Sequence, residues 1–294
     1  MRFSSVLRHI PGFRALIDMR REVMAIFLDV QVIRRTAEAQ LATTGTSYVE
    51  SLLRQPQYAD PRHLAHHELC VHSQGGEDGI VAEVFRRIGT TSRTFLEVGV
   101  ESGVENNTLL LLRQGWRGYW VEGEPGNAAM VRAQFAAEIA SGQLTLIEAV
   151  LTSDNAAGVL RAAGVPDEVD LLSIDIDRNT WHVWRAVDGI RARAAIVEYN
   201  ASFGPRADWV IDDAPTVPWN GTVNFGASLA ACERLGRERG LSLVGCTLNG
   251  IDAFFVEASL AAAHFAGPFT SEALWEPPRY WLRWRLGHST GPLR

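Results

Sequence analysis

The stretch 97–108 reads EVGVESGVENNT and follows the apolar run TFL at 94–96. An apolar segment that runs into Gly99 and Gly103 is typical of a buried strand that turns sharply into a helix, because glycine adopts backbone conformations that other residues avoid. In open α/β sheets such a turn lies at the carboxyl end of a strand, where ligands bind. The GxxxG spacing lacks the GxGxxG pattern of dinucleotide-binding turns and the GK[ST] end of a phosphate-binding loop.

From about residue 76 onwards, apolar segments of strand length alternate with segments of helix length. This alternation predicts parallel strands joined by right-handed helical crossovers. The predicted strands are 94–100, 118–121, 144–150, 169–176, 194–198, 241–247 and 251–256, and the predicted helices are 77–88, 108–113, 127–140, 156–163, 181–187 and 223–239. Only three residues separate the last two strands, which predicts an antiparallel hairpin. The fold class is therefore α/β, a Rossmann-like parallel sheet that closes with a C-terminal antiparallel hairpin.

The two ends of the chain depart from this alternation. Residues 13–33 place apolar side chains at three- and four-residue steps, which predicts a long helix that starts after PG at 11–12. TTGTS at 43–47 predicts a loop, and a short helix follows at 48–55. The predicted division is a helical N-terminal extension at 1–68, an α/β domain at 69–260, and a tail rich in Pro, Trp and Arg at 261–294 that packs on the domain or on a partner subunit.

Composition excludes several classes of protein. The 294 residues are 47% apolar and 21% charged, so the chain can build a core and is not a disordered protein. A net charge of −6 is unfavourable for binding nucleic acid. No apolar run reaches the roughly 20 residues that a membrane span needs, and arginines interrupt the segment where a secretory signal would lie. The 3 cysteines lie far apart, so we expect reduced thiols in a cytoplasmic protein without a structural zinc site.

An acidic residue follows the second predicted strand. Glu122 comes about 20 positions after the second glycine of the turn, the distance at which an acid can hydrogen-bond both hydroxyls of a ribose. With these features the chain resembles the class I S-adenosylmethionine-dependent methyltransferases and, within them, the FkbM-like group. The resemblance covers roughly residues 70–257, and its motifs are SQGGEDG at 73–79, the turn at 97–108, LSIDID at 172–177 and EYN at 198–200. One departure is Arg178, where the resemblance predicts glycine.

The resemblance implies S-adenosylmethionine as the cofactor and a set of residues that bind it. These residues are Glu97, Gly99, Glu101, Gly103 and Asn107 at the methionine part, Glu122 at the ribose, and Thr152 near the adenine.

Three carboxylates follow neighbouring predicted strands. Asp175 and Asp177 end the fourth strand and Glu198 ends the fifth, so the three should converge at one edge of the sheet. Together they could hold a divalent cation such as Mg²⁺, which would orient a diol and lower the pKa of the hydroxyl to be methylated. The interpretation that we favour has no metal: Asp175 and Asp177 position the cofactor amine and cap the next helix.

Methyl transfer to oxygen also needs a group that takes the hydroxyl proton. His182, next to Trp181, is the predicted base, with Asp177 as a second catalytic candidate. The alternative is a histidine packed among tryptophans without a catalytic role. A denser group of histidines at 63–72 has metal-ligand spacing but no HExxH motif, so we interpret it as a surface or interface segment.

These observations predict an enzyme that moves a methyl group from S-adenosylmethionine to a hydroxyl of a sugar or glycosylated metabolite, in a protein that can form homo-oligomers. The long connection at 200–220 is placed to cover the acceptor. One alternative is a methyltransferase-like scaffold without catalysis that acts as an interaction protein through its N-terminal helices and its tail. An NAD-linked oxidoreductase is disfavoured by the glycine spacing.

Overall fold

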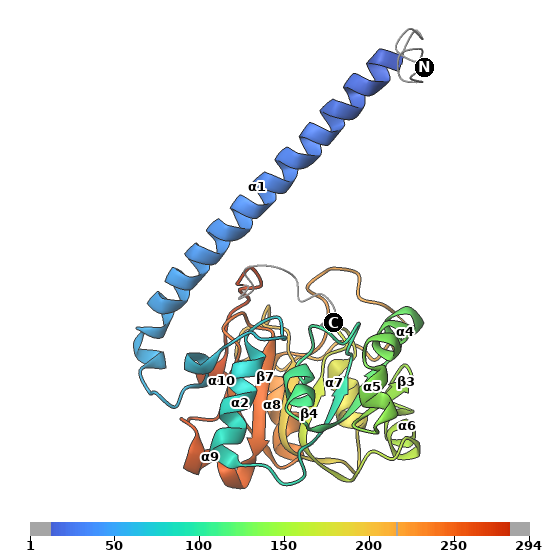
Figure 1. Ribbon diagram of the computed structural model, residues 1–294. Helices are drawn as coiled ribbons and strands as arrows, with labels where there is room; N and C mark the ends of the chain where they lie inside the picture. Colours follow the sequence, from blue (N-terminus) through green and yellow to red (C-terminus); the bar gives the residue numbers. More distant parts are fainter. Residues whose placement is uncertain (1–12, 216, 283–294) are drawn as a thin grey trace. The chain divides into compact units, whose positions relative to one another are not determined.

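The computed structural model describes residues 13–215 and 217–282. Its contacts divide the chain into a first unit that ends at Val49 and a second that begins at Glu50, which we call the body. The described part of the first unit belongs to one long helix, α1, which extends from Phe13 to Leu53 (Figure 1). In the part of the chain that the structure describes, no helix combines the length and the apolar character that crossing a membrane requires.

Helix α1 is longer than the sequence predicts. The predicted loop at 43–47 is wrong, because the helix continues through it. Thr36 and Thr43 donate their hydroxyl hydrogen bonds to the carbonyl oxygens of Val32 and Ala39, 2.9 and 3.0 Å away. Because these hydroxyls hydrogen-bond to carbonyl groups of the same helix, they do not draw the backbone into another conformation. The threonines therefore do not end the helix here. The predicted start at 11–12 lies outside the described residues.

A seven-stranded sheet forms the centre of the body. Its strands are β1 (Thr94–Val98), β2 (Arg117–Glu122), β3 (Leu144–Glu148), β4 (Glu168–Ile174), β5 (Arg191–Glu198), β6 (Leu241–Cys246) and β7 (Asp252–Glu257), in the order β3-β2-β1-β4-β5-β7-β6. Strands β1 to β5 run parallel to one another, whereas β7 runs antiparallel to both β5 and β6. The predicted α/β class with its closing antiparallel hairpin is confirmed.

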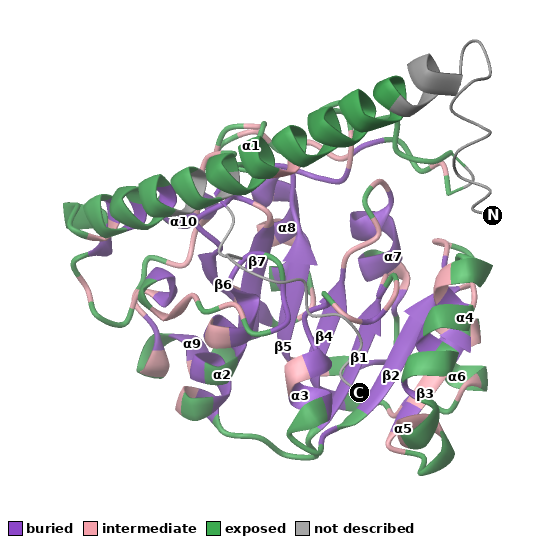
Figure 2. Ribbon diagram, turned by 45° about the horizontal axis from the view of Figure 1, so that its top comes forward, coloured by how far each residue is buried: buried purple, intermediate pink, exposed green. Residues whose placement is uncertain are grey.

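Helices cover both faces of this sheet, whose strands are largely buried (Figure 2). One core packs α6 (Ala156–Ala162), α7 (Thr180–Ala186), α8 (Leu229–Glu238) and α10 (Ser271–Leu274) on the sheet, and the other packs α2 (Glu77–Ile88), α3 (Leu109–Arg113), α4 (Pro125–Gln134) and α9 (Ala258–His264). The predicted helix at 127–140 is interrupted at Phe135, after which α5 (Ala136–Ala140) begins. Helix α8 starts later than predicted because the Ser228 side chain caps it by accepting the Ala231 N–H.

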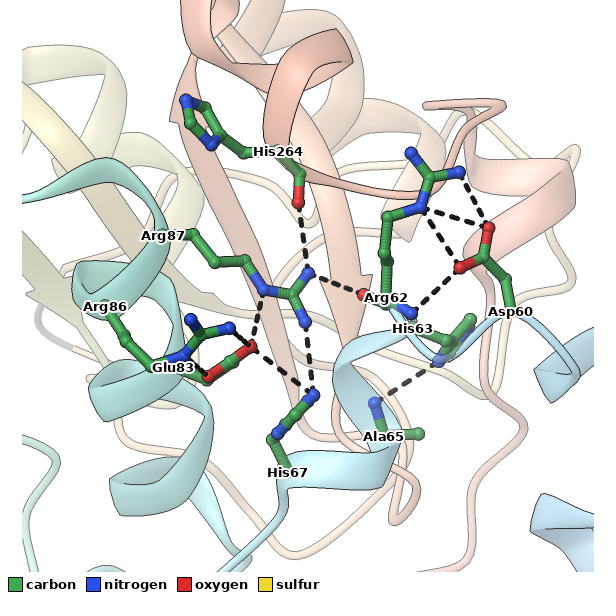
Figure 3. Close-up of polar contacts among 9 residues, drawn as sticks. All are labelled: Asp60, Arg62, His63, Ala65, His67, Glu83, Arg86, Arg87 and His264. Atoms are coloured by element: carbon green, nitrogen blue, oxygen red, sulfur yellow. Dashed lines mark hydrogen bonds and ion pairs between the residues drawn. The ribbon is translucent and has the colours of Figure 1, made fainter.

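The histidines before α2 form a polar network with that helix (Figure 3). After the short turn η2 (Pro56–Tyr58), the turn η3 (Leu64–His67) is capped by the Nδ1 atom of His63. His67 Nε2 lies 3.1 Å from Arg87 Nη2 and 3.5 Å from Glu83 Oε1. Hydrogen bonds from Arg86 above all lower the pKa of Glu83 to about 2. Of the i,i+4 histidines, His67 therefore ties this segment to α2, whereas His63 caps the turn.

Candidate active site

The sheet register aligns carboxyl side chains along the edge where the parallel strands end. The residue before Gly99 is paired with the residue before Glu122 on one side and with the residue before Asp175 on the other. Gly99 therefore lies between Glu122 and Asp175, at the same position along the strands. In the same way Asp175 lies level with Glu198, and Glu198 is paired directly with Asp252. We call Glu122, Asp175, Glu198 and Asp252 the carboxylate row. Gly99, which has no side chain, occupies the gap in this row between Glu122 and Asp175.

Strand alternation places the row on one face of the sheet. Trp120, Ile196 and Phe254 each lie two residues from a member of the row, and all three belong to the core beneath α2 and α3. Residues two apart on a strand share a face, so the row points to that face as well. Glu97, two residues before Gly99, lies on the same side. The start of α2 therefore lies on the same face as the row.

Burial makes three members of the row, Asp175, Glu198 and Asp252, hold their protons more tightly than free carboxyl groups do. Burial and then repulsion from Asp177 raise the pKa of Asp175 to about 6. Burial likewise raises the pKa of Glu198, which hydrogen-bonds Asp175, and that of Asp252, which hydrogen-bonds Glu77. The charges that shift these pKa values most are themselves carboxylates. Such a site favours a cationic ligand and repels a phosphate.

Glu97 supports the turn from inside. Its carboxylate, 2% exposed, accepts hydrogen bonds from Asn106 Nδ2 and the Asn107 N–H at 2.8 Å each, and from the Thr108 hydroxyl. Burial raises the pKa of Glu97 to about 8. Asn107 in turn donates to Ser173 on β4 at 3.2 Å. Both residues thus hold the shape of the turn, and their direct contact with a cofactor stays a prediction.

Two glycines let the turn approach its neighbours closely. Gly99 has a φ of 87°, and a Cβ there would overlap the Asp175 carbonyl oxygen. Gly103 has a φ of 77°, and its Cβ would lie 2.9 Å from Trp120 and 3.0 Å from Phe135. Both positions therefore require glycine for conformation and for space. Gly99 packs against the Asp175 backbone, whereas Gly103 packs on the core.

Strained backbone marks two of the predicted site residues. Among the described residues, the non-glycine residues with positive φ are Arg93, Glu101 at 49° and Asp177 at 60°. Such conformations are costly and are concentrated at functional sites. Burial raises the pKa of both acids, and repulsion from Asp177 adds to the shift of Glu101. The left-handed residue of the turn after β4 is Asp177 itself, so the glycine that the resemblance predicts at 178 is not required there.

Glu122 and Thr152 lie at the ends of neighbouring strands. Glu122 is 7% exposed, and its Oε1 accepts the Glu124 N–H at 2.7 Å. The Thr152 hydroxyl accepts the N–H groups of Asp154 and Asn155 at 3.3 Å each, which stabilises the turn before α6. The structure thus places Glu122 in the row and Thr152 in the turn after β3.

The side chain of His182 contacts the connection between β5 and α8. It is buried, its Nε2 lies 2.7 Å from the Ile211 carbonyl oxygen, and its Nδ1 lies 3.9 Å from Asp213. Asn179 also donates to Asp213 at 2.8 Å. These contacts join α7 to the long connection between β5 and α8. The prediction that His182 is the base therefore stays a prediction, and the ring's observed role is to hold this connection.

The three acids predicted as metal ligands are not arranged as a metal site. Asp175 hydrogen-bonds Glu198, which also accepts the Thr180 hydroxyl at 3.2 Å, whereas Asp177 is exposed. Across residues 13–215 and 217–282, no three His, Cys, Asp or Glu side chains form a group that could hold a metal ion. This geometry gives the metal assignment of Asp175, Asp177 and Glu198 no support, and no metal enters the proposed mechanism.

Sequence reasoning missed Glu77 and Asp252. Asp252 is the first residue of β7, and the hairpin register with β5 is the signal that could have found it. Glu77 lies in the SQGGEDG motif and accepts the Gly75 N–H at 2.7 Å. A Cβ on Gly75 would overlap both Glu77 and the amide of Asn249. The motif therefore brings a carboxyl group from outside the sheet up to the end of the row.

The tail also contributes to this edge. Tyr280 hydrogen-bonds Ser202, and the charge of Glu198 helps to raise its pKa, although burial is the larger cause. Glu276 is 3% exposed and accepts hydrogen bonds from Tyr58 and Arg279 at 2.8 Å each. These contacts hold the tail against the body and bring Tyr280 near Glu198.

No protein-family model matches this chain, and no curated protein matches it. Solved structures show weak similarity. They include a Klebsiella pneumoniae protein assigned as an O-methyltransferase (18% identity, 74% of this chain and 97% of that chain, TM-score 0.42), the N-terminal domain of EvdMO1 in the presence of SAH and D-fucose (15%, 62% and 82%, 0.40), and a Bacillus cereus O-methyltransferase in complex with SAH (15%, 74% and 89%, 0.40). Similarity at this level identifies neither a family nor a substrate.

Proposed function

We propose that this chain is a methyltransferase that uses S-adenosylmethionine. The observation that carries the proposal is the carboxylate row with Gly99 in its gap. Open α/β sheets bind ligands at the carboxyl ends of the strands, where the strand order reverses, and here it reverses between β1 and β4. A gap flanked by carboxylates fits the sulfonium and ammonium groups of S-adenosylmethionine, whereas the pyrophosphate of a dinucleotide would be repelled.

Individual residues suit the parts of this cofactor. Glu122, buried at the end of β2, is placed to accept hydrogen bonds from two ribose hydroxyls. Asp175 and Glu101 supply negative charge for the ammonium group, and Gly99 lets the cofactor approach the backbone. Thr152 would lie near the adenine. The FkbM-like subgroup remains part of this proposal, supported by the motifs at 73–79 and 198–200.

The acceptor is proposed to be a hydroxyl of a saccharide or a glycosylated metabolite. Glu198, Ser202 and Tyr280 meet at the edge of the sheet beyond the cofactor gap. Carboxylates can accept hydrogen bonds from sugar hydroxyls, and aromatic rings cover apolar sugar faces. The rings of Tyr280 and Trp281 are 41% and 44% exposed, which provides such surfaces.

Bound in this gap, S-adenosylmethionine would supply an electrophilic methyl group. The chain's own contribution is to orient the acceptor and to remove its proton. Asp177 is exposed, strained and adjacent to the row, and partial desolvation of its carboxyl group raises its pKa above that of a free aspartate. We therefore favour Asp177 as the proton acceptor and keep His182 as the alternative.

Calorimetric titration of the full chain with S-adenosylmethionine tests the cofactor. Glu122→Gln should weaken binding by about tenfold to a hundredfold, because a charge-assisted hydrogen bond is lost. The matched control is Glu148→Gln, which changes the residue paired with Glu122 on β3, an exposed acid that Arg132 already binds. No binding to the wild type at millimolar cofactor, or equal losses in both variants, would contradict the proposal.

Methyl transfer from labelled cofactor to a panel of saccharides separates the enzyme from a non-catalytic scaffold. A scaffold would bind the cofactor and transfer nothing. Asp177→Asn should retain cofactor binding within about twofold and lose transfer by about 100-fold or more, as expected for removal of a general base. His182→Ala serves as the comparison: if it alone abolishes transfer with the fold intact, His182 is the base and Asp177 is not.

A further inference from the structure

Helix α1 carries an unbroken apolar seam in its described part. The seam residues are Met19, Val23, Ile26, Val30, Ile33 and Ala37. The five larger side chains are 55%, 61%, 61%, 51% and 67% exposed, in that order. They follow one another in alternating steps of four and three residues over about five helical turns. A single helix cannot cover such a seam with its own side chains.

The spacing of the seam identifies the kind of surface that covers it. Steps of four and three repeat every seven residues, the period at which two helices wrap around each other in a left-handed coiled coil. Val23 and Val30 then occupy the a positions, and Ile26 and Ile33 the d positions. β-Branched residues at both core positions are compatible with a coiled coil of parallel helices. The seam therefore fits another helix with the same repeat.

Charges beside the seam select the orientation of that helix. Glu22 and Asp29 fall at g positions, and Arg20 and Arg34 fall at e positions. In a parallel pair of identical helices, Asp29 of each copy faces Arg34 of the other. In an antiparallel pair, Asp29 would face Asp29 and Arg20 would face Arg34, and like charges repel. Charge complementarity therefore favours a parallel second copy of this same helix.

We propose that two copies of this chain associate through a parallel coiled coil of their α1 helices along the seam. Each partner covers the other's valines and isoleucines, and two Asp29–Arg34 pairs form, one on each side. Met24 and Leu28, 51% and 56% exposed, lie off the seam and stay outside this interface. The proposal does not depend on the activity of the body.

The mass of the full chain, measured by light scattering over a range of concentrations, tests the pairing. The wild type should have the mass of two chains. Asp29→Arg and Arg34→Asp should each raise the dissociation constant about tenfold or more, because each sets like charges against each other. The double variant D29R/R34D should restore pairing, since the charges are again opposite. A merely structural defect would not be rescued in this way.

Crosslinking tests the orientation. In a parallel pair an a position meets its own copy, so Val23→Cys should form a disulfide-linked dimer on oxidation, as its Cα atoms come within bonding range. Ala25→Cys, at an outward position of the same turn, is the matched control and should not crosslink. The parent chain, with its three cysteines, is oxidised alongside.

Three results would overturn the proposal. The first is a monomer at all concentrations measured, and the second is an Arg34→Asp variant that pairs more tightly than the wild type, as an antiparallel pair predicts. The third is a chain that is monomeric in solution and sediments with vesicles of phosphatidylcholine and phosphatidylserine, since lipid would then cover the seam. None of these outcomes would affect the cofactor titration of the body.

Discussion

Helices α1 and α2 place the same residue type in opposite surroundings (Figure 2). Ile80 of α2 is fully buried between the helix and the sheet, whereas Ile26 of α1 is 61% exposed. In the body, both the sheet and the helices that pack on it belong to the same unit, so they bury each other's apolar residues. The seam of α1 is exposed and needs another surface to bury it, and its heptad spacing indicates that this surface is a second helix. Folding of the body and pairing of α1 should therefore be separable by mutation.

The largest expected effect is in the body. Gly99→Ala should lower the free energy of unfolding by about 4 kcal/mol or more and abolish cofactor binding, because the residue is left-handed and its Cβ overlaps the Asp175 backbone. Gly115→Ala is the matched control: its φ is 84°, but a Cβ there meets no atom within 4 Å, so only about 1 kcal/mol should be lost. Denaturant unfolding measures both, and equal losses would show that close approach at Gly99 is unimportant.

Matched truncations of isoleucine compare the two regions directly. Ile80→Ala should destabilise the body by about 3 kcal/mol, since it leaves a cavity in a packed core. Ile26→Ala should change unfolding of the body by less than about 0.5 kcal/mol, as exposed substitutions usually do. Its effect should be found in the mass of the protein instead, which should shift toward the single chain. A large loss of body stability in Ile26→Ala would mean that the two regions fold together.

The buried carboxyl groups should give the body a characteristic pH dependence. The pKa values of Glu97 and Asp175 are raised to about 8 and about 6, so the folded body binds more protons than the unfolded chain between about pH 4 and pH 8. Stability should therefore be highest near pH 4 to 5 and fall by several kcal/mol as the pH rises to 8. Glu97→Gln should flatten this profile. Unfolding midpoints in urea at several pH values measure the slope, and stability that rises with pH would contradict it.

The smallest expected effect has the opposite sign. Gly45 lies inside α1, where a Cβ would meet no atom within 4 Å. Gly45→Ala should therefore stabilise the helix by about 0.5–1 kcal/mol, because alanine loses less conformational entropy there. Far-ultraviolet circular dichroism during heating measures the change. A decrease in helical content would indicate that the helix does not pass through this position.

Much of the fold could be predicted because its signals are local. The predicted strands match the observed ones to within a few residues, since buried parallel strands are continuous apolar runs bounded by turn residues. Helix α2 was predicted with its observed bounds. The break at Phe135 and the helices α9 and α10 were not predicted, because packing on the sheet rather than local pattern decides them.

Less of the candidate site could be predicted. Composition and spacing indicated Gly99, Glu122, Asp175 and Glu198 as separate residues at strand ends. That they form one row, and that Asp252 continues it, follows from strand register. His182 looked like a base beside tryptophans, yet its ring faces Ile211 and Asp213, which come from a connection that no local pattern places.

The sequence alone determined the α/β class, the glycine turn after the first strand and the three- and four-residue spacing of apolar residues in α1, because each depends on residues close together in the chain. Only the tertiary structure decided which carboxyl groups are neighbours, which of them are buried and what His182 contacts. The physical reason is that a carboxyl group's proton affinity depends on the water removed from it and on the charges near it. Both are set by parts of the chain far away in sequence.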